Sequence, residues 1–250
     1  MTEPRGVRFE TDGPVGRIVL ERPEAANSFD LRAAQAFGAV VDQAASTAVH
    51  ALTITGDGKR FCTGGDVGSF AAAEDSSSYL HLLATELESH LRRLSELPKP
   101  VVAGVHGAVA GAGLSLLLNA DLVIAGAGTK FVFAYGGIGL TPDCGVSWLL
   151  PRAVGQQRAL EFALTGRVLT AMEAREWGLV TEVVDDDDDV GHTHRLARTL
   201  ADGPTQAYGE TRRLIRGARD TSRSAKDEAE TIARMVNTGD AQRLISQFIS

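Results

Sequence analysis

The sequence predicts an α/β fold, in which a layered domain of strands and helices is followed by a mainly helical region. Short runs rich in β-branched residues are bounded by glycine and proline, and longer runs with apolar residues at helical spacing lie between them. From about residue 156 the helical spacing dominates. A chain of 250 residues, 44% of them hydrophobic, can bury one large core of this kind.

The expected strands of the first half are the clearest β-branched runs, at residues 16–20, 51–55 and 101–105. The expected helices are residues 31–45 and 79–97, where apolar residues recur every three or four positions. Strands and helices therefore alternate along the chain, which is the order found in domains whose helices cover a sheet.

The second half is expected to be mainly helical, because its apolar residues recur at helical spacing in residues 159–164, 171–177 and 194–200. An acidic run interrupts this pattern at residues 185–189. We expect the run to be a solvated loop, because adjacent carboxylates repel one another inside a helix. A metal site built from these carboxylates is the less favoured interpretation.

Composition excludes several classes of function. The net charge of -7 and the pI near 5.4 argue against a surface for nucleic acid or for an anionic membrane, since such surfaces need clustered Lys and Arg. No apolar stretch reaches the roughly 20 residues of a membrane span. The cysteines are Cys62 and Cys144, and no charged and then apolar leader opens the chain, so we expect a soluble cytoplasmic protein without a disulfide framework.

The histidines give no indication of a metal site. His106 follows the third expected strand and has no acidic partner close in the sequence, so a structural role is expected for it. His192 and His194 lack the spacing to a cysteine or to another histidine that zinc sites use. We therefore predict no metal.

The most informative segment is residues 101–121, where an apolar strand is followed by closely spaced small residues and then by an apolar helix. Gly107, Gly111 and Gly113 have no Cβ atoms and let backbone approach a ligand. The unpaired N–H groups at the start of the following helix suit an anion or an oxyanion. Tight packing of strand against helix explains the glycine spacing equally well, so the spacing alone leaves both interpretations open.

Other glycine-rich sites fit this segment less well. A dinucleotide loop normally closes the first strand–helix unit, whereas this segment lies past residue 100, and Asp121 is too close to be the ribose-binding acid. A Walker loop would need Gly rather than Thr129 before Lys130. Neither Ser115 nor Ser147 lies in the Gly-x-Ser-x-Gly turn of hydrolases.

Several ordered motifs resemble the enoyl-CoA hydratase/isomerase (crotonase) family. The glycine segment, with Leu118, Asn119, Ala120 and Asp121 after it, is similar to the family signature. Residues 60–67, Arg-Phe-Cys-Thr-Gly-Gly-Asp-Val, are similar to the family's Phe-Cys-Ala-Gly-Ala-Asp-Leu segment. Further blocks stand in family order at residues 21–27, 139–145 and 149–155, and the resemblance covers roughly residues 7–250.

The resemblance implies a fold, a substrate class and an assembly. Residues 1–190 are expected to form a crotonase-like spiral of ββα units, and residues 191–250 a helical C-terminal trimerisation region. The expected partner is an acyl-CoA thioester substrate, in a homotrimer or a homohexamer. Coenzyme A would enter as part of the substrate, with no separate cofactor.

The resemblance also assigns an oxyanion hole to the backbone N–H groups of Gly65 and Ala112, which would bind the thioester oxygen. Other positions expected along the bound coenzyme A thioester are Gly64, Gly65, Asp66, Val67 and Gly111. Ala26 belongs with them, at a place where the family often carries Lys or Arg near the coenzyme A phosphates. One expected charge contact is therefore missing.

The catalytic groups of family hydratases are replaced in this chain. Their two glutamates fall on Ser115 and Tyr135, so the acid/base pair that positions water is absent. With an ordinary pKa near 10, Tyr135 is a poor base at neutral pH, and we interpret it as an aromatic residue that lines the cavity.

One carboxylate remains at a position that the family uses. Asp143 matches the proton-shuttling aspartate of dienoyl-CoA and epoxyacyl-CoA isomerases. Its alternative role is the N-cap of a helix that follows it. We predict an isomerase, with a hydratase-like enzyme of other specificity and a non-catalytic acyl-CoA-binding protein as alternatives.

Overall fold

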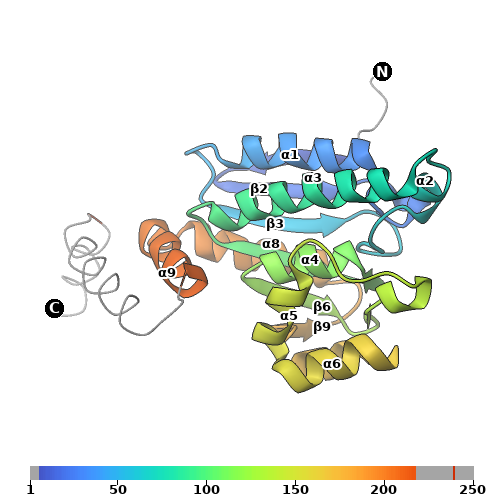
Figure 1. Cartoon of the computed structure of the whole chain (residues 1–250). Helices are drawn as coiled ribbons and strands as arrows, with labels where there is room; N and C mark the ends of the chain where they lie inside the picture. The colour runs from blue at the N-terminus through green and yellow to red at the C-terminus, as the bar shows by residue number, and fades with distance from the viewer. Residues whose placement is uncertain (1–5, 218–238, 240–250) are drawn as a thin grey trace.

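The main sheet of the protein is mixed and largely parallel. A computed structural model describes residues 6–217 and residue 239 (Figure 1). Within these residues, the six-stranded sheet has the order β1 (Val7–Asp12), β2 (Val15–Leu20), β3 (Ala51–Gly56), β4 (Val101–Val105), β6 (Leu122–Gly126) and β9 (Glu182–Val184). The β1–β2 pair is antiparallel, and each of the other pairs is parallel.

A second, three-stranded sheet brings the chain to the candidate site. It consists of β5 (Ala108–Ala110), β7 (Lys130–Val132) and β8 (Val168–Thr170). The strand β5 is parallel to β7, and β7 is antiparallel to β8. Because β5 directly precedes a helix, its register fixes where that helix begins.

Helices cover the main sheet on both faces. Successive strand residues point to opposite faces, and Val101 and Ala103 belong to the large core while Val102 belongs to a smaller one. The large core lies under α1 (Leu31–Ala44) and α3 (Ser76–Glu96). The smaller core lies under α8, which spans Asp189–Ala201.

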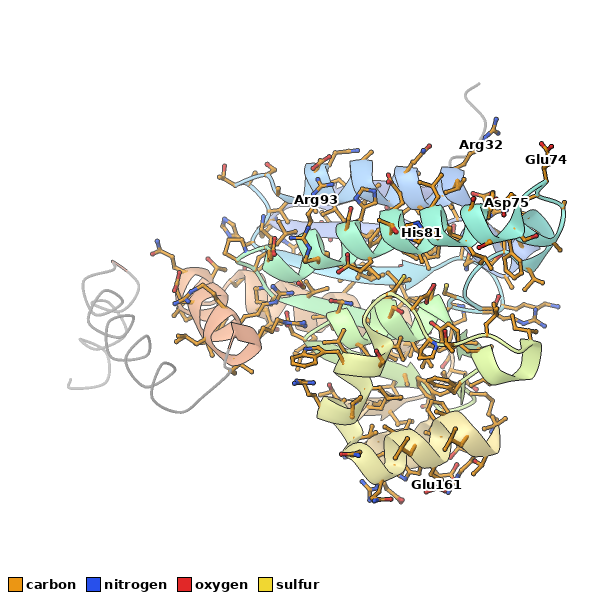
Figure 2. All side chains as sticks on the ribbon, viewed as in Figure 1. Arg32, Glu74, Asp75, His81, Arg93 and Glu161 are labelled. Atoms are coloured by element: carbon orange, nitrogen blue, oxygen red, sulfur yellow. The ribbon has the colours of Figure 1, made fainter. Side chains whose placement is uncertain are left out.

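Polar contacts at the surface tie α1 to α3. Asp75 caps α3 by accepting a hydrogen bond from Ser78 N (3.1 Å), and Arg93 of α3 forms an ion pair with Asp42 of α1. Figure 2 shows Asp75, His81 and Arg93 spread along α3 on its outer side. The apolar side of α3 therefore faces α1 and the core.

The remaining helices are short and surround the second sheet and the end of the main sheet. They are α2 (Val67–Ala71), α4 (Ala112–Asn119), α5 (Val146–Val154), α6 (Gln156–Thr165), α7 (Ala171–Glu176) and α9 (Thr205–Gly217), with the 3-10 helices η1 (Pro23–Ala25) and η2 (Tyr135–Ile138). In the part of the chain that the structure describes, no helix combines the length and the apolar character needed to cross a membrane.

The α/β fold predicted from the sequence is confirmed, with additions in the second half. Each expected strand and helix of the first half is present within a few residues of its expected ends. The mainly helical second half also contains β8 and β9, which are three-residue strands too short to give a sequence pattern. The division at residue 190 falls inside α8 and stays a prediction, as does the trimer; residues 218–238 and 240–250 of the predicted C-terminal region lie outside the described residues.

The prediction of a solvated loop at residues 185–189 holds for Asp186, which is exposed in a turn, and is wrong for Asp189. Asp189 begins α8, is only 5% exposed and forms an ion pair with His106 (Nδ1 to Oδ2, 3.2 Å). Asp186 accepts a hydrogen bond from Gly128 N (2.7 Å). His106 thus has the acidic partner that its sequence surroundings did not indicate, because folding brings together residues 83 positions apart.

The His106–Asp189 pair predicts a pH-dependent contribution to stability. The Asp189 carboxylate beside its ring is the main reason why the pKa of His106 is raised. A raised pKa means that the contribution is full below about pH 6.5, the ordinary pKa of histidine, and is lost as the pH rises through the raised value. Compared with His106→Gln, the wild type is therefore expected to gain about 1–2 kcal/mol in free energy of unfolding near pH 6.

Urea unfolding of the wild type and of His106→Gln between pH 5.5 and 9 measures the difference in their free energies of unfolding. It should shrink steadily toward alkaline pH. A difference that stays constant or grows with pH would contradict a charged pair.

Candidate active site

The candidate site begins with a backbone segment, residues 62–66, that pairs with the loop before α1 on one side. Phe29 N donates to Gly64 O (2.8 Å), and Asp66 N donates to Phe29 O (2.8 Å). This is the pattern of a parallel bridge between Phe29 and Gly65. In such a bridge the N–H of the central residue, here Gly65, points away from its partner. The Gly65 N–H therefore makes no hydrogen bond to the loop before α1, which binds Gly64 and Asp66.

On its other side, the same segment pairs with β5. Cys62 N donates to Ala108 O (3.3 Å), and Ala110 N donates to Cys62 O (2.9 Å). A Cβ on Gly113 would lie 2.4 Å from Cys62 O, so only glycine permits this approach of α4. The first turn of α4 is thus packed directly against the segment.

Gly64 and Gly111 make a second close contact between the segment and the start of α4. Gly64 has a φ of +104°, and a Cβ there would lie 3.2 Å from Ala112 N and from Gly111 Cα. Gly111 has a φ of +51°, and a Cβ there would lie 3.1 Å from Gly64 Cα. The glycine pattern at residues 107–113 therefore serves a close approach of backbone to backbone, beside the start of a helix.

The N–H groups of Gly65 and Ala112 lie on these two touching segments. Ala112 is the first residue of α4, where N–H groups have no partner inside the helix and carry partial positive charge. Among the residues that the structure describes, neither Gly65 N nor Ala112 N donates a hydrogen bond. Two unpaired donors on adjacent segments form a geometry suited to one oxygen that gains negative charge.

Ala26 lies on the same edge of this segment as Phe29, opposite β5. Ala26 O accepts hydrogen bonds from Thr63 N (3.2 Å) and from Thr63 Oγ1 (3.3 Å). The next residue, Asn27, is buried and holds three backbone positions: its Oδ1 accepts from Arg22 N, and its Nδ2 donates to the carbonyls of Asp57 and Arg60. These three hydrogen bonds of the Asn27 side chain were not predicted from the sequence.

Asp66 and Val67 form the start of α2. Asp66 caps this helix by accepting a hydrogen bond from Ser69 N (3.2 Å) and forms an ion pair with Arg22 (3.0 Å). Burial opposes ionisation of Asp66, but Ser69 and Arg22 outweigh it and lower the pKa of this carboxyl. Val67 is 47% exposed. Asp66 is thus committed to contacts within the protein, whereas Val67 is open to a ligand.

Asp143 accepts a hydrogen bond from a residue that the sequence did not connect with it. Tyr135 Oη donates to Asp143 Oδ1 at 2.8 Å. The alternative role of Asp143 as a helix N-cap is wrong, because α5 begins after Gly145 and has no side-chain cap. The carboxylate is therefore turned toward Tyr135 and away from the helix.

The loop that carries Asp143 is tightly bent. Cys144 has a φ of +48°, which is rare for a residue with a side chain, and Gly145 follows with a φ of +80°. Val146 N donates to Asp143 O (3.0 Å), and Cys144 Sγ donates to the carbonyl of Ala84 in α3 (3.7 Å). The backbone of Asp143 is thus held by α5 and by α3.

Two helices connect Asp143 with the paired backbone segments. Leu83 of α3 is the nearest contact of a Cβ placed on Gly65 (3.9 Å), and the next residue, Ala84, contacts Cys144. In α4, Ser115 lies one turn after Ala112 and close enough to Tyr135 to affect the pKa of its phenol. The structure therefore brings the predicted residues Gly65, Ala112 and Asp143 to one region.

Tyr135 is a proton donor and cannot serve as a base near neutral pH. Burial and the neighbouring charge of Asp143 raise the pKa of its phenol. Ser115 counteracts a little of this rise, although its hydroxyl is fully buried and forms no hydrogen bond among the described residues. Tyr135 is buried like the cavity-lining aromatic residue we expected, but its hydroxyl contact to Asp143 is a feature that composition and spacing do not indicate.

Neither cysteine fits the role of a nucleophile. Burial raises the pKa of the Cys62 thiol to about 12. Burial, together with the charge of Asp143, also raises the pKa of the Cys144 thiol. Both thiols are therefore protonated at neutral pH, and thiolate chemistry is excluded. The arrangement offers the Asp143 carboxylate and a pair of backbone donors.

Comparison with known proteins gives a consistent result. The family profile described as "Enoyl-CoA hydratase/isomerase" matches residues 10–243. The 1,2-epoxyphenylacetyl-CoA isomerase of Escherichia coli (strain K12) is 40% identical over 207 residues, which cover 80% of this chain and 78% of the relative. A probable enoyl-CoA hydratase of Rhodobacter capsulatus is 38% identical over 209 residues, which cover 84% of this chain and 80% of the relative.

A solved structure extends the likeness to nearly the whole chain. The crystal structure of a putative enoyl-CoA hydratase/isomerase from Mycobacterium abscessus superposes with a TM-score of 0.93 at 34% identity, covering 97% of this chain and 96% of that one. The fold expected from the sequence motifs is therefore the fold of this structure.

Proposed function

Because the chain belongs to the enoyl-CoA hydratase/isomerase family, we propose that it is an acyl-CoA isomerase in which Asp143 transfers a proton beside a thioester. The observation that carries the proposal is the Asp143 carboxylate, anchored by Tyr135 at 2.8 Å, in the region of the unpaired N–H groups of Gly65 and Ala112. Coenzyme A enters as part of the substrate. The isomerase among the similar proteins supports the same reaction class.

The chemistry follows from charge. When Asp143 removes a proton from a carbon conjugated with the thioester, the electron pair left behind moves onto the thioester oxygen. The N–H groups of Gly65 and Ala112 stabilise this oxyanion, at roughly 3–4 kcal/mol for each donor. Return of the same proton to another carbon of the conjugated system moves the double bond, and no water is consumed.

A substrate screen tests the proposal. Purified protein is incubated with a panel of enoyl-, dienoyl- and epoxyacyl-CoA thioesters, and products are identified by chromatography with mass spectrometry. Isomers of unchanged mass are expected from at least one thioester. Products heavier by one water would support the hydratase alternative, and binding without conversion of any thioester would support the non-catalytic one.

The same panel carries a specific prediction for crotonyl-CoA. We expect hydration of crotonyl-CoA to be at background level, because Ser115 and Tyr135 cannot hold a water molecule between two carboxylates. Loss of the ultraviolet absorbance of the conjugated thioester measures hydration, with an authentic enoyl-CoA hydratase as the positive control. Rapid hydration would contradict the assignment of Asp143 as the one acid/base group.

A further inference from the structure

Tyr135 and Asp143 form a contact that the proposed proton transfer does not by itself require. The donor is the first residue of η2, and the acceptor lies eight residues later in the loop before α5. The hydrogen bond occupies Oδ1 only, and Oδ2 accepts no hydrogen bond from the residues that the structure describes. The two carboxylate oxygens of Asp143 are therefore in different environments.

The phenol of Tyr135 is held in place by packing. Its ring centroid lies 5.1 Å from that of Phe133, which lies 6.0 Å from that of Phe162. Phe162 in turn packs edge-on against Trp177 at 6.4 Å. A ring fixed by this aromatic cluster presents its hydroxyl in one direction, and that hydroxyl keeps its proton because burial raises the pKa of Tyr135.

The loop contacts hold the backbone of Asp143 but leave its carboxylate free to turn. Val146 N and the bent backbone at Cys144 and Gly145 act on the main chain only. Rotation about the Cβ–Cγ bond is a soft torsion with a broad energy minimum. The Tyr135 hydroxyl donates the hydrogen bond that opposes this rotation, and the buried Cys144 thiol lies beside the same carboxylate.

We propose that Tyr135 is a positioning residue that holds Oδ1 of Asp143 and thereby leaves Oδ2 as the oxygen that carries the proton. This inference rests on the proposed isomerase function. Between the two steps the proton resides on Oδ2, and the acid must stay oriented until it delivers that proton to the second carbon. The hydrogen bond from Tyr135 to Oδ1 persists in both states of Asp143, so it keeps the acid aligned throughout.

The test is Tyr135→Phe, which removes the hydroxyl and keeps the ring in the aromatic cluster. We expect kcat to fall about 10- to 100-fold, the effect of losing a hydrogen bond to a charged group, with KM within about 2-fold. The acid limb of the pH profile of kcat/KM should move to higher pH, because a carboxylate that loses a donor is protonated more easily. A purely structural role would lower the melting temperature and leave the profile in place.

Tyr79→Phe is the matched control. Its hydroxyl also makes one contact, with Leu31 N at 3.4 Å, but this contact lies at the start of α1. This variant is expected to keep the kcat and the pH profile of the wild type. Both variants should melt within a few degrees of the wild type.

A second measurement tests the contact without turnover. The chain has three tyrosines, so labelling with 13C at Cζ gives three signals, of which Tyr135→Phe identifies one. In Asp143→Asn that signal should move upfield, because its hydroxyl then donates to a neutral amide, while the signals of Tyr79 and Tyr208 stay. In the wild type, the chemical shift of the Tyr135 signal should change at acid pH as Asp143 takes up a proton. In Asp143→Asn this change should be absent.

The outcomes separate the two proposals. An active wild type, an inactive Asp143→Asn variant and an unchanged Tyr135→Phe variant would overturn the positioning role and leave the isomerase standing. A Tyr135 signal whose chemical shift does not change in Asp143→Asn would also overturn the positioning role. A wild type that converts no thioester would count against the proposed function, and the NMR signal would still decide whether the hydrogen bond exists.

Discussion

Asp143→Asn is expected to lower turnover of the best thioester about 10²- to 10⁴-fold, the loss that follows removal of a general acid/base. Asparagine has nearly the same size and can still accept a hydrogen bond from Tyr135 Oη, but it cannot take up or release the proton. Substrate affinity should therefore change little. Steady-state kinetics and the Kd of a non-reactive acyl-CoA analogue measure the two quantities.

Stability provides the control for this prediction. Since α5 begins at Val146 without a side-chain cap, Asp143→Asn removes no helix cap, and the melting temperature should stay within a few degrees. Asp187→Asn, in the exposed part of the acidic loop, is the matched surface substitution and should keep full turnover. Normal turnover in Asp143→Asn would remove the aspartate from the mechanism.

Gly65→Pro is expected to lower kcat about 10²- to 10³-fold, the typical effect of losing one oxyanion donor. Proline has no N–H, so the variant lacks one of the two proposed hydrogen bonds to the thioester oxygen. The folded protein loses no hydrogen bond of its own, because Gly65 N donates to none of the described residues. The effect should therefore appear in kcat/KM rather than in stability.

Gly65→Ala is the control for the loss of the donor. A Cβ at this position would meet only Leu83 Cδ2, at 3.9 Å, so the backbone can accept alanine, and the N–H is retained. This variant should keep most of the turnover, while melting curves of both variants report any disturbance of Gly64 by the proline ring. Equal activity of the two variants would contradict a role of Gly65 N in catalysis.

The fold was predictable where local pattern and three-dimensional structure agree. Strands β2, β3 and β4 carry β-branched runs because they are buried on both faces, and such runs are visible without any knowledge of their neighbours. The glycine spacing before α4 reflects backbone contacts that only glycine permits, so it is visible as well. The pairing of Gly65 with Ala112 came from the family resemblance of these motifs, because the glycine spacing alone left two interpretations open.

The side-chain contacts of the site were not predictable in the same way. Tyr135 and Asp143 meet because a 3-10 helix and a bent loop turn toward each other, and neither the spacing nor the residue types encode that geometry. His106 and Asp189 meet because α8 packs across the sheet. The acidic run suggested a solvated loop, and the burial of its last aspartate depends on a partner from another part of the chain.

The proposed catalytic groups are of two chemical types, main-chain N–H groups and side chains. Residues 62–66, which pair with the loop before α1 and with β5, carry one of the main-chain groups, Gly65 N. The proposed oxyanion donors are main-chain atoms, which most substitutions leave unchanged provided that Gly64 and Gly111 keep their close contact. The proposed acid/base group and the tyrosine proposed to position it are side chains on the loop before α5 and on η2. A substitution within residues 135–145 can therefore change the proposed proton-transfer group without altering the main-chain donors on residues 65 and 112.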